Sequence, residues 1–549
     1  MARVRALSKT DRRRRRKATS RRPSMAPEFH LRSKTQAPSA EQGSSTSPEV
    51  FIRQPQMTAC KAFLTVSVIA LTVLVLSSCA VGPDFQKPSA PAVKSYTVAP
   101  IAGTIGSTNI PGGGPQHFTE GLDIPGQWWE LFHSEQLNAL IERSLSNNPS
   151  IKAAQAALTV ARETTLAQKG AYWPSVTGSF SAARQKTSED ISPTPSSGAL
   201  YFNLFTPQVS VSYMPDVFGL NRRTVESSQA QAEQARFALA ATQITLTANV
   251  AAAAIQEASL RGQIAATSEI LAINSNMVQV LSNQFTKGYV GRLDLAAQES
   301  QLAQVATTLP PLFKQLAQQR DLLAALSGIF PSEGPAEQFE LSSLHLPLEL
   351  PLSLPSQLVA QRPDVRQAEE NLHAASAQVG IAVANRLPNI TLSGDLGTMA
   401  LEAGSMFAAG AGFWTLAGSV TQPIFQGGTL LHKERGARAA YLQAAEQYRS
   451  AVLAAFQNVA DTLNAMEQDA SAVQAASEAK GAAGITLDLA RKQFQSGYAN
   501  YLTLLSAEQI YQQALINLVQ AQANRYADTA ALFLALGGGW WNQGELGKN

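Results

Sequence analysis

The chain has 549 residues, of which 45% are hydrophobic, 15% charged and 7% aromatic. This even spread of hydrophobic residues excludes a multi-pass helical membrane protein, and the abundant Ala, Gln, Leu and Ser favour helices. Residues 1–56 contain 14 Lys and Arg against 4 Asp and Glu; because the whole chain has a net charge of +3, the other 493 residues carry −7. The basic character is therefore confined to an N-terminal tail.

The tail lacks the interleaved aromatic residues and the hydrophobic periodicity of a nucleic-acid-binding domain. We expect translation to start at Met57 and residues 1–56 to be a basic, disordered extension; nucleic-acid binding is the alternative. No nucleic-acid partner is expected for the remaining chain.

Residues 57–78 have the organisation of a secretory signal peptide. Lys61 precedes an apolar run of 15 residues, Ala62–Leu76, which is short for a transmembrane helix, and two small serines follow. The sequence LSSC (Leu76–Cys79) resembles a bacterial lipobox, in which the cysteine thiol takes a diacylglycerol and the new amino terminus takes an acyl chain. A buried thiol or a disulfide are the alternatives, but Cys60 would leave with the signal peptide. Ala80 favours the outer membrane in the sorting that this resemblance implies.

The rest of the chain is an internal duplication. Pro149 and Pro363 start similar segments, NNPSIKAAQAAL and QRPDVRQAEENL, at an offset of 214 residues. The segments FTKGYVGRLDLAAQE (Phe285–Glu299) and FQSGYANYLTLLSAE (Phe494–Glu508) are offset by 209. Several anchors at nearly constant spacing indicate two copies of about 180 residues.

Each copy opens with a short helix, expected at Ser150–Lys169 and Asp364–Asn385, and continues with two alternating strands. In the first copy the strands flank a turn-rich loop, Ser188–Gly198. Ten-residue alternating strands are typical of tilted transmembrane β-barrels, and because four strands cannot close a barrel, three chains would supply twelve. A soluble four-stranded sheet is the alternative. The apolar positions that define the strands are Val176, Gly178, Phe180, Val209, Val211, Tyr213, Ile390, Leu392, Leu396, Leu416, Gly418 and Val420.

Each strand pair is followed by a proline-free helical segment of about 65 residues, Asn221–Gln284 and Thr429–Gln493. Such a helix spans roughly 100 Å, more than a globular domain needs. In the first segment, two sets of apolar residues each recur every seven residues and form seams on opposite flanks of the helix. This pattern fits a ring of helices or a plain antiparallel bundle. The seams are Phe237, Ile244 and Ala251, and Leu239, Leu246 and Ala253.

A linker rich in Pro and Leu, Pro331–Pro355, separates the copies. We expect it to wrap the helices as an equatorial band with the segments before Asn147 and after Leu536. The six histidines lack metal-ligand spacing, and the chain has no C-x-x-C, G-x-S-x-G or Walker motif. We therefore expect no metal, no cofactor and no enzymatic activity.

Several motifs together resemble the outer-membrane factor family, in its NodT/OprM-like lipoprotein branch and more distantly TolC. They are CAVGPDFQKP (Cys79–Pro88), WWELFHSEQLNALIERSLSNNP (Trp128–Pro149), QPIFQGG (Gln422–Gly428), GYANYLTLLSAEQ (Gly497–Gln509) and ALGGGW (Ala535–Trp540). The resemblance implies a lipid-anchored homotrimer in the outer membrane that extends into the periplasm. Its fold would be α+β, a twelve-stranded β-barrel with four strands per chain continuing into a twelve-helix α-barrel.

The resemblance also implies the exit duct of a tripartite efflux system, with a periplasmic adaptor and an inner-membrane transporter as partners. The cargo would be drugs or other small toxic compounds; a type I protein secretion duct is the alternative within the family. A structural coiled-coil envelope lipoprotein is the alternative from another class.

The two helix–helix turns, Phe285–Asp294 and Phe494–Thr503, are called the tip below, and the resemblance implies that they form the periplasmic gate and adaptor contact. Asp294 matches a family position whose carboxylate helps hold the gate closed, and its counterpart here is Thr503. Ser506 and Ala499 stand where relatives often carry Asp, so packing by Tyr501 and Leu502 is expected to matter more. The predicted tip residues are Gly288, Gly291, Arg292, Leu293, Asp294, Gly497, Asn500, Tyr501, Leu502 and Thr503.

These expectations divide the chain into seven parts: the extension 1–56, the signal peptide 57–78, the lipidated and equatorial segment 79–146, the first repeat 147–330, the linker 331–360, the second repeat 361–536 and the tail 537–549.

Overall fold

The computed structural model describes residues 80–107, 110–186, 188 and 201–544. The expected signal peptide and Cys79 lie outside these residues, as does nearly all of the expected loop Ser188–Gly198.

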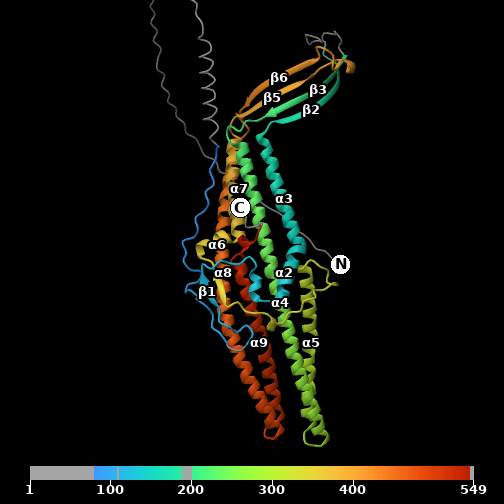
Figure 1. Ribbon diagram of the computed structural model, residues 1–549, viewed down its shortest axis with the longest axis vertical. Coiled ribbons are helices and arrows are strands. Elements are labelled where there is room, and N and C mark those ends of the chain that lie inside the picture. Colours follow the sequence, from blue (N-terminus) through green and yellow to red (C-terminus); the bar gives the residue numbers. More distant parts are fainter. Residues whose placement is uncertain (1–79, 108–109, 187, 189–200, 545–549) are drawn as a thin grey trace, which may run out of the picture. The chain divides into compact units, whose positions relative to one another are not determined.

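Two long helical hairpins dominate the described chain (Figure 1). The expected long helices are both present, and each is 67 residues long, roughly 100 Å at 1.5 Å per residue. Each continues through a short turn into a returning helix of 35 residues. The hairpins are α4 (Leu220–Thr286) with α5 (Arg292–Leu326), and α8 (Thr429–Gln495) with α9 (Tyr501–Ala535).

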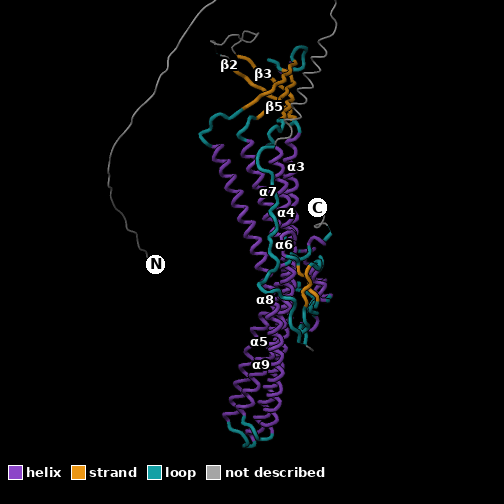
Figure 2. The backbone as a smooth tube through the Cα atoms, turned by 90° about the vertical axis from the view of Figure 1, so that its left-hand side faces the viewer, coloured by secondary structure: helices purple, strands orange, loops and turns teal. Residues whose placement is uncertain are grey.

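The shorter helices α3 (Pro149–Lys169) and α7 (Pro363–Ala384) open the two copies, as expected. Each has proline in its first turn, where the missing N–H is not needed. Helix α4 packs against α3 and α7 along one part of its length and against α5 and α9 along the rest, whereas α8 packs against α7 and α9. Near the four-stranded sheet the helices therefore lie in the order α3, α4, α7, α8 (Figures 1 and 2). Nearer the hairpin turns, α5 and α9 take the places of α3 and α7, and the order is α5, α4, α9, α8.

The position of α4 between neighbours confirms the two expected seams. All six seam residues are at most 7% exposed: Phe237, Ile244, Ala251, Leu239, Leu246 and Ala253. Among the described helices, α4 alone has a window long and apolar enough to cross a membrane by length and composition, and 61% of that window is buried inside the protein.

Four antiparallel strands form one sheet in the order β2-β3-β5-β6, which confirms two strands per copy. Strand β3 joins the copies because it pairs with β2 on one side and with β5 on the other. The strands are β2 (Ser175–Lys186), β3 (Tyr201–Tyr213), β5 (Asn389–Thr398) and β6 (Gly412–Thr421).

The expected band contains two short strands that the sequence did not indicate. Strand β1 (His117–Glu120) pairs in parallel with β4 (Glu349–Leu352), so the N-terminal segment joins the linker between the copies. The band also includes α2 (Glu135–Asn147) and α6 (Pro355–Gln361). Its C-terminal segment is tied to α6 by the Trp540 indole, which donates a hydrogen bond to the Gln361 carbonyl at 2.7 Å.

The band is anchored to α9 by a fully buried arginine. Arg525 Nη2 donates hydrogen bonds to the Gly114 carbonyl at 2.6 Å and to Thr104 Oγ1 at 3.0 Å. Next to this contact, Trp128 stacks on Phe533 with 5.0 Å between ring centroids. These contacts join residues about 400 positions apart in the chain.

Candidate functional site: the sheet faces and the hairpin turns

The two faces of the four-stranded sheet differ in chemistry. Because register places Val176 beside Val211, Val209 beside Leu396 and Leu396 beside Trp414, the apolar positions that define the strands share one face. Nothing in the described chain covers this face, and its large side chains are between 38% and 79% exposed. They are Val176, Phe180, Val209, Val211, Leu392, Leu396, Trp414, Leu416 and Val420.

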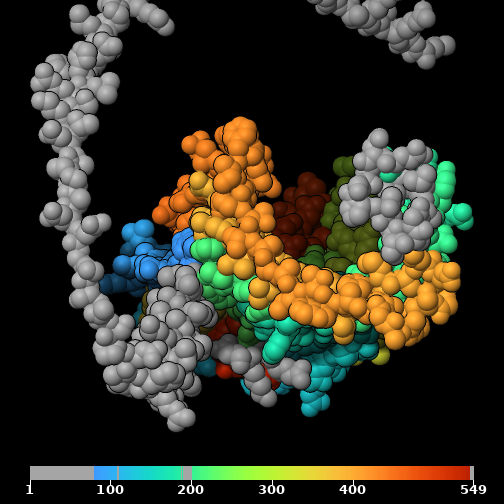
Figure 3. All heavy atoms as spheres, turned by 90° about the horizontal axis from the view of Figure 1, so that it is seen from above, coloured from blue at the N-terminus to red at the C-terminus, as the bar shows by residue number. Residues whose placement is uncertain are grey.

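The opposite face is mainly polar, with Phe202, Leu204 and Phe413 as apolar exceptions. Ser210 donates a hydrogen bond from Oγ to Asp395 Oδ1 at 2.6 Å across two strands, and Gln208 donates to Ser210 at 3.2 Å. Serine and threonine fill most of the remaining positions on this face. An exposed apolar face with a polar face behind it is the alternation of a transmembrane barrel, since a soluble sheet would bury its apolar face. In the view from above, the orange strands curve around a hollow beyond which the red α9 and olive α5 lie further away (Figure 3).

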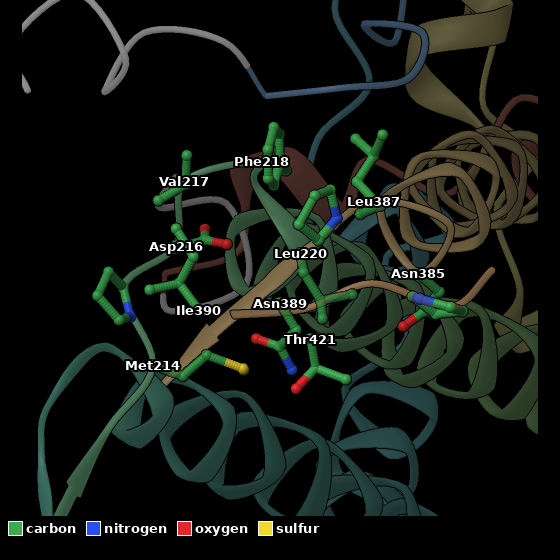
Figure 4. A pocket seen from close by; sticks show the side chains of 14 residues that line it. Met214, Asp216, Val217, Phe218, Leu220, Asn385, Leu387, Asn389, Ile390 and Thr421 are labelled. Atoms are coloured by element: carbon green, nitrogen blue, oxygen red, sulfur yellow. The ribbon is translucent and has the colours of Figure 1, made fainter. Parts of the chain in front are cut away.

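The strands meet the helices at a junction with a pocket of about 330 Å³ (Figure 4). Val217 and Phe218 line it from the segment between β3 and α4, and Asn385 and Leu387 line it from the segment after α7. Asp216 caps the start of α4 at this junction. Its carboxylate accepts hydrogen bonds from two N–H groups of the first turn, those of Asn221 at 2.9 Å and Arg222 at 2.8 Å.

The N-terminal segment, residues 80–88, is docked beside this junction. The Val81 N–H donates to the Phe218 carbonyl at 3.1 Å, and Arg223 Nη2 forms an ion pair with Asp84 at 2.6 Å. Phe85 stacks on His373 of α7 with 4.3 Å between ring centroids. The imidazole contacts Glu226 of α4 and Glu370, each at 3.2 Å; these hydrogen bonds, that to Glu226 above all, raise the pKa of His373 to about 9.

At the far ends of the hairpins, both turns depend on glycine. Gly288 and Gly497 have φ of 75° and 76°, the left-handed region that other residues rarely adopt. The turns close in the same way: the Gly288 N–H donates to the Phe285 carbonyl at 3.0 Å, and the Gly497 N–H to the Phe494 carbonyl at 3.1 Å.

The returning helices are capped by different side chains. Asp294 accepts the Gly291 N–H at 3.3 Å with its own carboxylate, one turn into α5. Asn500 stands at the N-cap of α9 and accepts the Thr503 N–H at 3.0 Å and the Thr503 hydroxyl at 2.9 Å. Within one chain, the Asp294 carboxylate is therefore used to cap its own helix.

The tip residues divide into exposed and buried sets. Leu293 and Leu502 are 82% and 65% exposed, and Arg292 forms a solvent-exposed ion pair with Glu299 at 3.2 Å. Tyr501, in contrast, is 4% exposed. It packs in a small core shared by the two hairpins, together with Met277, Leu281, Leu295, Leu487, Ala490, Leu504 and Ala507.

Three polar residues next to Tyr501 were not indicated by the sequence. The Tyr501 hydroxyl donates to Gln298 Oε1, and Gln298 Nε2 donates to Asn274 Oδ1 at 2.7 Å. Glu508 lies beside them on α9 and is 2% exposed. Burial above all, and then the charges of Glu508 and Asp294, raise the pKa of the Tyr501 hydroxyl. The only signal in the sequence was that Glu508 is the duplicate of Glu299.

Comparison with known proteins identifies the class of protein. The model of the outer membrane efflux protein family matches residues 140–329 and 354–538, more than half of the chain. The chain belongs to the outer membrane efflux protein family, and the resemblance inferred from its motifs is confirmed.

Curated relatives and solved structures agree. The chain is 27% identical over 478 residues to the toluene efflux pump outer membrane protein TtgC of Pseudomonas putida, covering 86% of this chain and 96% of TtgC. It is 25% identical over 476 residues to the probable outer membrane lipoprotein SilC of Salmonella typhimurium, covering 85% and 97%. The solved structure of the outer-membrane channel OprN superposes with a TM-score of 0.76 at 26% identity, covering 84% of this chain and all of OprN.

Proposed function

We propose that three copies of this chain close into one duct, with a twelve-stranded barrel in the outer membrane and a twelve-helix barrel below it. The observation that carries the proposal is the order of elements. In the described chain, β2 and β6 are the two edges of the sheet, and α3 with α5 and α8 are the corresponding edges of the helical layer. A second copy can therefore continue the sheet and the helices together, and the alternating strand directions make the new β6–β2 pair antiparallel. Closing the ring removes the open strand edges, which lipid does not tolerate.

The exposed side of α8 supports this assembly. Four large apolar side chains on it are exposed, and at about 100° per residue they lie within about 40° of one another around the helix. They are Leu442, Leu453, Ile485 and Leu489. An apolar stripe along an edge helix fits contact with the α3 and α5 edge of a neighbouring copy.

The duct would conduct passively, with the apolar sheet face toward lipid and the polar face, including Ser210 and Asp395, toward the lumen. An inner-membrane transporter would supply the energy and a periplasmic adaptor would engage the tip. Small toxic compounds are the proposed cargo. The relative TtgC is named as a toluene efflux protein, and toluene is a small toxic compound. The uncovered apolar sheet disfavours a purely structural coiled-coil lipoprotein.

Cysteine crosslinking tests the ring. Ser181→Cys on β2 would be combined in turn with Thr415→Cys, Ala417→Cys and Ser419→Cys on β6, all on the polar face. We expect at least one pair to give disulfide-linked dimers and trimers in membranes. The control is Ser181→Cys with Thr206→Cys, which are register partners in one chain and should crosslink without a change in mass. Crosslinking in the control alone would contradict the proposed ring.

The tip is proposed as the gate and adaptor contact, with the residues predicted from the sequence. Its test is single-channel conductance in planar bilayers, where Asp294→Ala should raise the conductance of the resting trimer. An unchanged closed state would remove Asp294 from the gate.

The lipid anchor is proposed on Cys79, as a diacylglycerol on the thiol and an acyl chain on the amino terminus. Two or more chains anchor a protein stably, whereas one does so marginally. Labelled palmitate should be incorporated into the wild type and absent from Cys79→Ala. Labelling of the variant would show that the acyl chains lie elsewhere.

A further inference from the structure

A buried chain of polar side chains crosses between the two hairpins just behind the tip. It starts at Asn274 on α4, passes through Gln298 on α5 and reaches Tyr501 on α9. Asn274 and Gln298 have no exposed surface, and Tyr501 is 4% exposed. These contacts, with the apolar residues around them, hold the two hairpins of one subunit together.

Glu508 lies at the end of this row of polar side chains, and it is unusual for a carboxyl group in being buried without a hydrogen-bond partner in the described part of the protein. It is 2% exposed, and neither of its carboxyl oxygens has a hydrogen-bond partner among the described residues; the Gln298 amide lies close, outside hydrogen-bond geometry. A buried carboxylate without such partners is strongly disfavoured, whereas the neutral acid is tolerated.

The duplicate position shows that this burial is specific to one hairpin. The side chain of Glu299, 209 residues earlier, is 44% exposed and pairs with Arg292, which lies about two turns before it on α5. In the second copy the position of Arg292 is taken by Tyr501, which packs in the shared core and supplies no charge. The second glutamate has therefore lost the cation on its own helix and gained burial between the hairpins, and Arg491 on α8 is the cation that acts on it.

We propose that Glu508 is a positioning residue of the gate: as a neutral acid it packs behind the tip and keeps the two hairpins of a subunit joined, and its ionisation loosens them and favours the open duct. This inference rests on the proposed role of the tip as the gate. The tip would then respond to pH through a buried residue, without the exposed tip residues and without a bound partner.

The direction of the response follows from the surroundings of Glu508. Burial is the largest effect and raises the pKa of its carboxyl, while the charge of Arg491 on α8 and the Gln298 amide on α5 lower it by less. The other ionisable groups facing this cluster are Tyr501 on the same helix and Asp294 on α5; the pKa of the Tyr501 hydroxyl is raised, so this group stays neutral in the range tested and supplies no cation. Because the closed form binds the proton more tightly than an opened, hydrated form, acid favours closure and a rise in pH favours opening.

The test is the conductance of the purified full-length trimer in planar bilayers between about pH 5 and about pH 9. For the wild type, the ratio of open to closed channels should rise with pH, by up to about tenfold per pH unit for each subunit that opens, in the window between the two pKa values. Glu508→Gln mimics the neutral acid and should stay closed without this dependence. Glu299→Gln is the matched control, a duplicate position on the surface, and should keep the wild-type profile.

The outcomes separate this proposal from the one on which it rests. A pH profile that Glu508→Gln leaves unchanged overturns the role of Glu508 but keeps the tip as gate. A wild-type trimer that is fully open at every pH, with Asp294→Ala indistinguishable from it, overturns both.

Hydrogen exchange provides a second readout that needs no variant. Protection factors of amides in residues 292–302 and 501–511, corrected for intrinsic exchange, should fall together as pH rises, because both segments pack in the core beside Glu508. Those of residues 250–258, which pack in the main core away from the tip, should stay level. Level protection at the tip across this pH range overturns the proposal even if Glu508→Gln fails to assemble.

Discussion

The two 67-residue helices α4 and α8 begin and end at duplicate positions, 209 residues apart, yet they are packed differently. In α4, 30 residues are buried, against 13 in α8. Helix α4 has neighbours on both flanks, whereas α8 has α7 and α9 on one side. One duplicated sequence has therefore produced an inner helix and an edge helix, and the edge helix carries the exposed apolar stripe through which we expect the ring to close.

The two tip turns differ in the same way. In the first copy, Arg292 and Glu299 form a surface ion pair, a kind of contact that contributes little to stability. In the second copy, the duplicate positions, Tyr501 and Glu508, are buried between the hairpins. Tyr501 and Glu508 thus contribute to the contact between the hairpins, whereas their duplicates Arg292 and Glu299 lie at the surface.

The largest expected effect is at Tyr501. Tyr501→Ala should reduce the free energy of local opening at the tip by about 3–5 kcal/mol, as for other large buried aromatic residues. Arg292→Ala, its duplicate, should change this free energy by no more than about 0.5 kcal/mol. Native-state hydrogen exchange of residues 274–298 and 487–511 measures both, and equal effects would contradict the proposed difference between the turns.

The second comparison is between Ile244 and Leu453, duplicate positions on α4 and α8 that are 3% and 72% exposed. Ile244→Ala should lower the free energy of unfolding by about 2–5 kcal/mol, because it leaves a cavity in the chain. Leu453→Ala should leave the unfolding of the single chain unchanged and weaken the trimer instead. Denaturant unfolding and sedimentation of the two variants distinguish these effects; a trimer unaffected by Leu453→Glu would show that the stripe does not lie between subunits.

The third comparison is between His373 on α7 and its duplicate Thr159 on α3, which cannot titrate. Hydrogen bonds to Glu226 and Glu370 raise the pKa of His373 from 6.5 to about 9, so the folded state binds its proton more tightly. This contribution, about 2–3 kcal/mol, is fully present below pH 6.5 and is lost as pH rises through about 9. Hydrogen exchange of residues 81–87, which dock on His373, should show the loss in the wild type and no such step in His373→Gln.

The smallest expected effect is at the two helix caps. Asp294→Ala and Asn500→Ala should each destabilise their helix by about 0.5–2 kcal/mol, because each removes the side chain that accepts a free N–H. If capping is the whole role of Asp294, both variants change conductance equally. We expect a larger rise in conductance for Asp294→Ala, since it also removes a charge, and Asp294→Asn separates the two contributions.

Local patterns in the sequence were sufficient for the elements. The proline-free segments predicted both long helices to within two residues, and strict alternation predicted the four strands. That Val176 and Leu396 share a face came from the register of the sheet. The seams on α4 were predicted because 3.6 residues per turn places Phe237 and Leu239 on opposite flanks. Strands β1 and β4 were missed, because four residues are too few to show a period and they pair 232 positions apart.

The functional residues also divide into those that act locally in the sequence and those that depend on distant contacts. The turn glycines were predicted because they act within a few residues of their own position. Asp294 and Asn500 act just as locally, but they were predicted as gate residues and only the structure shows them as caps. The sequence contains both glutamates of the tip, yet it has no sign that Glu299 lies in solvent and Glu508 in a core, since a duplicate pattern predicts the same environment for both.

By itself, the sequence determined the duplication, the lengths of the helices, the alternation of the strands and the family to which the chain belongs. All of these depend on the order of neighbouring residues or on motifs that survive in each copy. Only the tertiary structure decided that α4 lies inside and α8 at an edge, that Arg525 is buried under the band, and that Glu508 is enclosed beside Tyr501 and Gln298. Burial depends on which distant segments pack against a residue, and that is a property of the folded arrangement rather than of the local sequence.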